Sequence, residues 1–332
     1  MKVLKAYKFR IYPDKAQIQY FIQTFGCVRF TYNHLLHARQ VALQKGVAWS
    51  NITPAMLKAD YPFLKKTDSL ALANAQRNLD RAFKNYFSNR AGFPKLKTKK
   101  SSWQSYTTNN QKHTIYFQDG QLKLPKLKSL IAVNQHRKIK GTIKSATISA
   151  KNNQLFFVSI LCLEEIKPLP KTMENIGVSY CPYHLFQLSK PLNWPSLEQK
   201  NVQTLLEKAN KKLQVRATAA KKRDVRLEKA KNYQKQKVKV EKLRNARNDQ
   251  CKDYIDQATY SLVRDFDTIY LERRPDFSEN KKFCESDWSF FVRKILYKAS
   301  WYGKQVIFID LPKGIESNKS DLIEQLGQKQ SP

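Results

Sequence analysis

Residues 175–179, NIGVS, form a short apolar run that follows two prolines and predicts a buried β-strand. A second apolar run at 184–188 predicts a neighbouring strand, and residues 267–272 and 306–309 predict two more. Between these last two strands, the apolar residues of 288–302 recur at the spacing of an α-helix. Strands that alternate with helices in this way are typical of an α/β domain.

The composition indicates a globular protein with a polyanionic partner. The chain has 332 residues, 41% of them hydrophobic, which is enough for two or three domains with their own cores. Lysine and arginine number 61 against 27 aspartate and glutamate, so the formal net charge is +34. Such a surplus repels itself in a compact fold unless a polyanion neutralises it, which favours nucleic acid as the partner. A basic ribosome-like or membrane-surface protein is the alternative.

The sequence predicts neither a membrane anchor nor a zinc site. No run approaches the roughly 18 apolar residues of a transmembrane helix, and the N-terminus alternates like a strand. The five cysteines are scattered and form no Cys-x-x-Cys pair, so we expect no four-cysteine zinc site. An odd number of scattered thiols suits a reducing cytoplasm.

The first half of the chain predicts helices inserted into a basic β-domain. Residues 1–12 alternate as a strand, Asp14 caps a helix, and Asp68 or Ser69 caps a second long helix. From residue 93 to 144 there are twelve lysines and arginines and one acid, with aromatic residues interleaved. Short alternating strands in this region predict a small antiparallel barrel. Basic side chains beside aromatic ones can bind phosphates and bases together, although a solvated barrel with an ordinary aromatic core is the alternative.

The region from 196 to about 264 is helical in character and strongly basic. Residues 208–247 carry sixteen lysines and arginines against three acids. A helix with so few apolar residues cannot lie wholly in a core, so this segment is either a solvated hairpin or a surface that faces phosphates. The nearby basic strands favour the second interpretation.

Eight segments, in order along the chain, resemble the TnpB family of transposon-encoded, RNA-guided nucleases, which are relatives of type V CRISPR effectors. The segments are YKFRIYP at 7–13, FGCVRFTYN at 25–33, NLDRAFKNYF at 78–87, GFPKLK at 92–97, SYTTN at 105–109, LKLPK at 122–126, GTIKSATI at 141–148 and YKASWYG at 297–303. Each is modest alone, but eight in this order are specific, and they span nearly the whole chain.

The resemblance implies a multi-domain α/β protein. Its plan is a wedge-type antiparallel β-barrel interrupted by a helical recognition lobe and followed by a truncated RuvC domain of RNase H-like fold. On this plan we expect the wedge domain at 1–13 and 92–170, the recognition lobe at 14–91, a degenerate RuvC-like domain at 171–314 with the basic insertion at about 196–264, and a tail at 315–332.

The sequence departs from the three carboxylates with which the family holds catalytic metal ions. Ser179 stands where the resemblance implies the first aspartate, and Glu272 stands where it implies the second-motif glutamate. We expect the third-motif aspartate and the preceding zinc finger to be absent, because the chain stops about where they would begin. Asp310 follows the last strand, at a position that is not catalytic in the family. Metal-dependent cleavage needs several hard anionic oxygens, so we expect no catalysis and no catalytic magnesium. Because we expect the zinc finger to be absent, we also expect no zinc.

Chains with these departures resemble nuclease-dead TnpB-like repressors. The resemblance implies a protein that binds a guide RNA, recognises a short motif beside a double-stranded DNA target and opens the duplex by guide pairing. The resulting R-loop over a promoter would block RNA polymerase without hydrolysis. We expect a bacterial, cytoplasmic protein without membrane contact, monomeric in a 1:1 ribonucleoprotein and associated with the nucleoid when bound.

The resemblance also implies contact residues. Candidates for reading the flanking DNA motif are Trp49, Thr53, Ser69, Ala73, Thr107, Thr108 and Asn109. Candidates for binding guide RNA or the heteroduplex are Arg10, Arg29, Lys95, Lys97, Lys99, Lys100, Lys221, Lys222 and Arg223. Relatives carry a basic residue and an amide near the positions of Ser69 and Ala73, so we expect a different preferred motif here. For any single lysine, a solvated surface charge is the alternative.

Two other functions stay open at this point. One is an active nuclease with displaced carboxylates, which would cut a matched target in a Mg²⁺-dependent way that Glu272→Ala abolishes. The other is a decayed transposon protein that only binds RNA, as a chaperone or accessory factor for its element. Both would share the basic composition, so charge alone does not separate them from a repressor.

Overall fold

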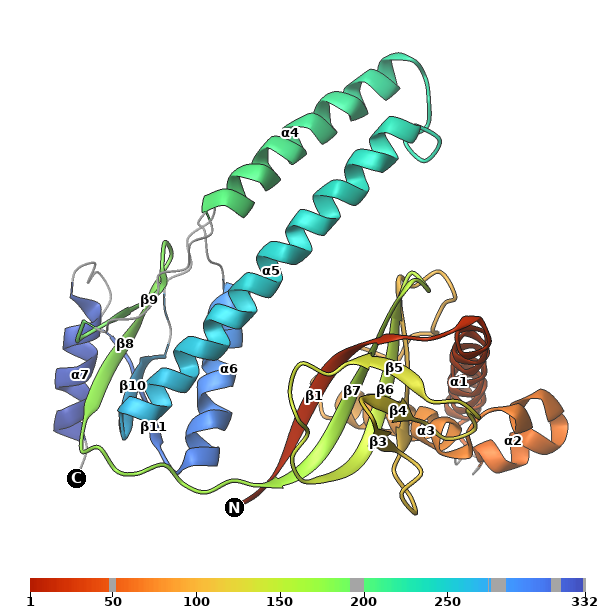
Figure 1. Ribbon diagram of the computed structural model, residues 1–332, viewed down its shortest axis with the longest axis horizontal. Helices are drawn as coiled ribbons and strands as arrows, with labels where there is room; N and C mark the ends of the chain where they lie inside the picture. The colour runs from red at the N-terminus through yellow and green to blue at the C-terminus, as the bar shows by residue number, and fades with distance from the viewer. Residues whose placement is uncertain (48–51, 192–199, 274, 276–284, 312–317, 331–332) are drawn as a thin grey trace. The chain divides into compact units, whose positions relative to one another are not determined.

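The computed structural model describes all residues except 48–51, 192–199, 274, 276–284, 312–317 and 331–332 (Figure 1). The chain divides into two compact units. The first unit comprises residues 2–165, and the second comprises Met1 and residues 166–332. Each unit contains its own β-sheet, so the expected multi-domain α/β organisation is confirmed.

An antiparallel seven-stranded sheet forms the centre of the first unit, in the order β2-β6-β7-β1-β5-β4-β3. Its strands are β1 (Lys2–Tyr12), β2 (Trp103–Asn109), β3 (Tyr116–Gln118), β4 (Gln121–Lys123), β5 (Ile131–Asn134), β6 (Thr142–Lys151) and β7 (Leu155–Glu165). Among the described strands, β2 and β3 are edges paired on one side, so the sheet is an open half-barrel, whereas the sequence predicted an antiparallel barrel. Strand β3, at one edge, and its neighbour β4 have three residues each, which is too short to close it.

Two capped helices pack on the inner face of this sheet. Helix α1 (Lys15–Gln44) begins with a capping box, in which Asp14 accepts from the Gln17 amide at 2.8 Å and the Gln17 side chain accepts from the Asp14 amide at 3.0 Å. Helix α3 (Ser69–Phe87) is capped by Asp68, which settles the choice between Asp68 and Ser69. The short helices α2 (Pro54–Asp60) and η1 (Pro62–Lys66) connect them. Aromatic residues of α1 and α3 lie in the shared core, as expected.

The second unit is built on a four-stranded sheet in the order β11-β10-β8-β9. Strands β8 (Asn175–Cys181), β10 (Thr268–Glu272) and β11 (Gln305–Ile309) are parallel, and β9 (Leu185–Leu188) is antiparallel to β8. Helix α6 (Glu285–Tyr302) and the inner end of α5 (Lys231–Asp265) cover one face of this sheet (Figure 1).

Helix α7 (Lys319–Gln330) covers the opposite face of the second sheet (Figure 1). It approaches through two glycines: a Cβ on Gly177 of β8 would overlap the Ser320 carbonyl, and one on Gly327 of α7 would overlap the Tyr270 ring. Ile323 is fully buried in the resulting contact. Residues 319–330 are therefore part of the domain and not the separate tail that the sequence predicted.

The basic insertion is a helical hairpin that projects from the second sheet (Figure 1). It consists of α4 (Lys200–Lys222) and α5, which agrees with the helical character predicted for about 196–264. Its outer part is held by a small core of Leu206, Ala209 and Val240. Most of its surface therefore stays exposed, which suits a role in binding.

Candidate functional site

Ser179 and Glu272 lie side by side on the face of the second sheet that α7 covers. Strands β8 and β10 are parallel, and Val178 pairs with Leu271, so the next register position joins these two residues. Both are buried, at 1% and 4% exposure. Glu272 Oε2 accepts a hydrogen bond from the Tyr180 backbone amide at 2.8 Å. The Ser179 hydroxyl has no hydrogen-bond partner among the described residues.

A lysine faces this pair from the start of α7. Lys319 Nζ lies 3.8 Å from Glu272 Oε1. Burial raises the pKa of the Glu272 carboxyl above its ordinary value, and the Tyr180 amide and Lys319 only partly oppose this. The pair therefore consists of a neutral hydroxyl and a carboxyl that is harder to ionise than usual, with an ammonium group beside it.

These residues do not fit a magnesium ion. Mg²⁺ requires anionic oxygens, whereas Ser179 is neutral and Lys319 repels a cation. Among the described residues, no group of three or more histidines, cysteines, aspartates or glutamates could hold a metal. Asp310 is exposed and pairs with Arg273 at 3.0 Å.

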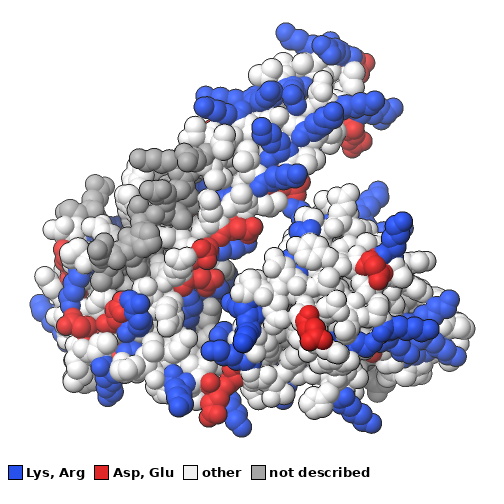
Figure 2. All heavy atoms as spheres, viewed as in Figure 1, with Lys and Arg blue, Asp and Glu red and all other residues white. Residues whose placement is uncertain are grey.

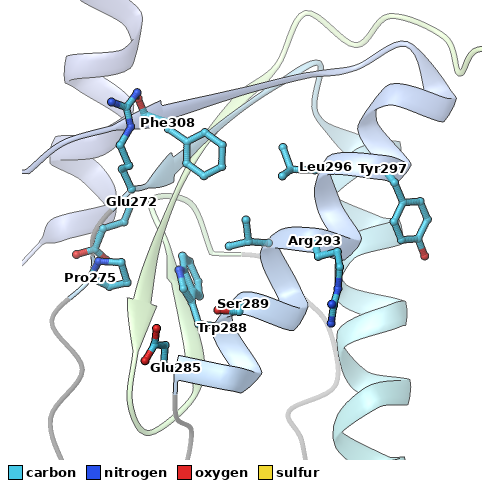
Figure 3. Close-up of a pocket in the computed structure, with 11 residues that line it drawn as sticks. Glu272, Pro275, Glu285, Trp288, Ser289, Arg293, Leu296, Tyr297 and Phe308 are labelled. Carbon is cyan, nitrogen blue, oxygen red and sulfur yellow. The ribbon is translucent and has the colours of Figure 1, made fainter. Parts of the chain in front are cut away.

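A groove opens beside Glu272 and runs along α6 (Figure 3). It has a volume of about 830 Å³, and its lining includes Trp288, Phe308, Leu296 and Arg293. Aromatic and cationic side chains on one surface are suited to nucleobases and phosphates. The same lining also includes the carboxylates of Glu272 and Glu285, so the groove combines aromatic, cationic and acidic side chains.

The flanking-motif candidates separate into residues on an accessible surface and residues in the core. Ser69 opens α3 and accepts a hydrogen bond from Lys58 Nζ at 2.6 Å, and Ala73 lies one turn later. Thr107 and Asn109 point outward from β2. Thr108 is 1% exposed and donates to Asp68, so its side chain is not available to DNA.

Thr53 and Trp49 belong to the same set of candidates. The Thr53 hydroxyl accepts a hydrogen bond from the Met56 amide at 3.4 Å and caps α2, so it also has a structural role. Trp49 lies outside the described residues.

Asn74 joins this surface, although the sequence did not single it out. Its side-chain amide donates to the backbone carbonyls of Leu70 and Thr107, both at 2.9 Å, and to Asn109 Oδ1 at 3.3 Å. It therefore ties the first turns of α3 to β2. The sequence feature that could have indicated this role is the position of Asn74, one residue after Ala73 on a predicted helix. The neighbouring strand is rich in hydroxyl side chains.

The guide candidates of the first unit lie on β1, on α1 and on the loop before β2. Arg10 stacks over the rings of Tyr12 and Phe157, and Arg29 Nη1 donates to Gln104 Oε1 at 3.1 Å. The remaining candidates, Lys95, Lys97, Lys99 and Lys100, are exposed on the loop.

Lys221, Lys222 and Arg223 are exposed at the outer end of the hairpin, far along the chain from the other guide candidates. Lysines and arginines gather over α4 and α5 with few acids among them (Figure 2). The structure thus places six of the guide candidates on the first unit and three on the second.

Comparison with known proteins gives consistent matches. Residues 1–47 match the family model HTH_OrfB_IS605, described as a helix-turn-helix domain, although in this structure that segment consists of β1 and the single long helix α1. A protein of Streptomyces pristinaespiralis named "Putative RNA-guided DNA endonuclease" is 26% identical over 93% of this chain and 78% of its own length. InsQ of Escherichia coli K12, named in the same way, is 23% identical over 93% of this chain and 81% of its own length.

Two further matches concern a shorter relative and a solved structure. The virulence protein VsdF of Salmonella dublin is 37% identical over 29% of this chain and 95% of its own length. A solved Cas12f1–sgRNA–target DNA complex matches the fold with a TM-score of 0.54 at 12% identity, over all of this chain and 95% of that one.

The two sheets, their helices and these matches place the chain in the class of proteins with the Cas12f fold. Within that class, the chain belongs to the TnpB family, as the eight segments predicted. Among its described residues, no helix is both long and apolar enough to span a membrane.

Proposed function

We propose that this protein is an RNA-guided DNA-binding protein without nuclease activity, which represses transcription by holding an R-loop at a promoter. Its relatives are named as RNA-guided DNA endonucleases, and its net charge of +34 suits a guide RNA and a DNA target. Guide pairing supplies sequence specificity in such systems, while the protein reads a short flanking motif.

The observation that best supports the proposed loss of cleavage is the contact between Glu272 and Lys319. A degenerate RuvC-like domain in the second unit would keep the fold of the nuclease but replace a metal ligand by Ser179 and set Lys319 3.8 Å from the remaining carboxyl. Phosphodiester cleavage by two metal ions needs several carboxylates around both ions. We propose that this centre now stabilises the domain and performs no chemistry.

The decisive experiment combines RNA and DNA mapping in the host. The protein is isolated with its RNA in a 1:1 complex, the RNA is sequenced, and occupied chromosomal sites are mapped. The proposal expects one discrete RNA, one end of which matches an occupied promoter whose transcript rises when the protein is deleted. Heterogeneous RNA with flat occupancy would contradict guided binding, and Mg²⁺-dependent cutting of the matched site would contradict the loss of nuclease activity.

A further inference from the structure

The face of the first sheet opposite α1 and α3, here called the outer face, carries a continuous set of surface residues from four strands. Ser105 of β2 pairs with Ser149 of β6, which pairs in turn with Phe157 of β7. Phe157 then pairs with Arg10 of β1. Side chains alternate between the two faces of a strand, so Trp103, two residues before Ser105, lies on the outer face too. The alternate residues of the same four strands are buried in the core with α1 and α3.

Five side chains on the outer face form a row in which aromatic and cationic groups alternate, in the order Tyr12, Arg10, Phe157, Lys8 and Trp103. The Arg10 guanidinium lies 5.7 Å from the centre of the Tyr12 ring and 5.4 Å from that of Phe157. Lys8 Nζ lies 4.7 Å from the centre of the Phe157 ring and 5.5 Å from that of Trp103. The rings at the two ends are accessible, since Tyr12 is 55% and Trp103 45% exposed. Accessible rings beside cations can stack bases while the cations bind the adjoining phosphates.

Among the described residues, no carboxylate neutralises the cations of this row. Strands β1, β2, β5 and β6 contain no acid, and Glu164 and Glu165 of β7 lie at the end of that strand that pairs with the first residues of β1. Neither Arg10 nor Lys8 has an ion pair or a side-chain hydrogen bond within the described part of the chain, and Arg10 Nε is buried without a partner. The row is therefore a positive surface that suits an anionic ligand from outside the chain.

A strip of hydroxyl groups runs beside the row. Ser105 and Ser149 pair across β2 and β6, and Ser159 lies two residues after Phe157 on β7. Thr107 and Thr147, the next pair along β2 and β6, bond each other at 2.8 Å. The three serines, in contrast, make no side-chain hydrogen bond to any described residue. A hydroxyl that can both donate and accept suits the 2′-hydroxyl of ribose, which distinguishes RNA from DNA.

We propose that the outer face binds an unpaired stretch of an RNA strand. Its bases stack on Trp103 and Tyr12, Lys8 and Arg10 bind the phosphates between them, and the serine hydroxyls contact ribose. A duplex does not fit this surface, because its base faces are covered by their neighbours. Stacking tolerates any base, since every base has a π-face. The inference rests on the RNA binding of the proposed function and adds to it a surface for the single-stranded part of that RNA.

The test uses the full-length protein stripped of its co-purified RNA. The probe is a short fluorescent RNA of alternating cytidine and uridine, which cannot pair with itself, and fluorescence anisotropy measures its affinity. Trp103→Ala should weaken binding about tenfold, and Trp103→Phe should recover most of that loss because a stacking ring returns. Lys8→Ala should lower the slope of log affinity against log salt by about 0.7, the value for one phosphate contact on a single strand.

The choice of RNA is tested with a DNA strand of alternating cytidine and thymidine. The wild type should bind the RNA probe more tightly than this DNA, and Ser149→Ala should narrow the difference because one hydroxyl contact to ribose is lost. Equal affinity of the wild type for the two strands would overturn the choice of RNA.

Two matched variants serve as controls. Tyr116→Ala removes a similarly exposed ring, at 40%, from the other edge strand of the same sheet, and Lys128→Ala removes an exposed charge from the same unit. Neither should change the affinity for the RNA probe as Trp103→Ala and Lys8→Ala do. Equal effects of Trp103→Ala and Tyr116→Ala would overturn the inference. So would a Trp103→Ala protein that melts at a lower temperature but binds RNA like the wild type, because the row would then serve only the stability of the sheet.

Failure of this inference and failure of the proposed function give different results. If the variants of the row bind the probe like the wild type, and the wild type still carries one discrete RNA from the host, the outer face is excluded while the proposed function stands. If the wild type carries no RNA from the host and binds neither strand, the proposed function itself is excluded.

Discussion

Lys319 at the start of α7 places its ammonium 3.8 Å from the buried carboxyl of Glu272. These residues meet on the face of the second sheet where Ser179 is also buried, and where the family pattern implies a metal-binding carboxylate. In the proposed function, the Lys319 ammonium therefore lies beside the Glu272 carboxylate, whose charge a metal ion would otherwise neutralise. A single carboxylate restored at position 179 would then form an ion pair with Lys319 and would not create a metal site.

Ser179→Asp is expected to leave the protein unable to cut DNA. A guide-matched duplex incubated with Mg²⁺ should stay intact on a denaturing gel, and Mg²⁺ should not raise the melting temperature of the variant. The combined variant Ser179→Asp/Lys319→Asp would place three carboxylates together, and Mg²⁺ should then stabilise it by linkage. Cleavage by the single variant would show that Glu272 and one restored carboxylate are enough for catalysis, contrary to our account.

Glu272→Gln should make stability less dependent on pH. The folded-state pKa of Glu272 is raised by burial, so the stability tied to this group is fully present below the ordinary carboxyl pKa and is lost as pH rises through the folded value. Glutamine cannot ionise and can still accept from the Tyr180 amide. Thermal unfolding across pH 4 to 8 should show a gain over the wild type that grows with pH, and a gain largest at acid pH would contradict this.

Gly177→Ala should destabilise the second unit by roughly 2–4 kcal/mol. The added methyl would overlap the Ser320 carbonyl and lie 2.9 Å from the Glu324 amide nitrogen, so α7 would have to move off the sheet. Denaturant unfolding measures the loss. Gly92→Ala is the control, because an added Cβ there meets no atom within 4 Å. Equal stability of the two variants would mean that α7 does not pack as described.

The pairing of strands around Ser179 and Glu272 follows from the sequence. The features that the sequence did not predict depend on contacts between residues far apart along the chain. The register of two parallel strands brings Ser179 beside Glu272, because apolar runs mark both strands. Strand β5 was missed because its four residues pair with the end of β1, a partner more than 100 residues away. The packing of helix α7 on the sheet was not predicted, because it docks through small residues instead of a broad apolar face. Nothing local to Lys319 indicates that it faces Glu272.

Asn74→Ala should weaken DNA recognition more than RNA binding. Asn74 holds the first turns of α3 against Thr107 and Asn109, which are candidates for reading the flanking motif. Affinity for DNA with and without the motif should converge in the variant, as measured with the guide-loaded protein. Thr108→Val is the contrasting change, because the Thr108 hydroxyl donates to the buried Asp68. Its loss should lower the stability of the protein by about 1–3 kcal/mol and leave the motif preference intact.

Replacing Lys221, Lys222 and Arg223 together by alanine should lower the salt dependence of nucleic-acid binding. Each phosphate contact contributes about one unit to the slope of log affinity against log salt, so the slope should fall by up to about three. The three residues are exposed at the outer end of α4, where the loss of charge should not affect the core. Lys126→Ala/Lys128→Ala, on the first unit, is the control for lost charge alone. If both variants reduce the slope in proportion to the charge removed, the hairpin acts only through net charge and makes no specific phosphate contacts.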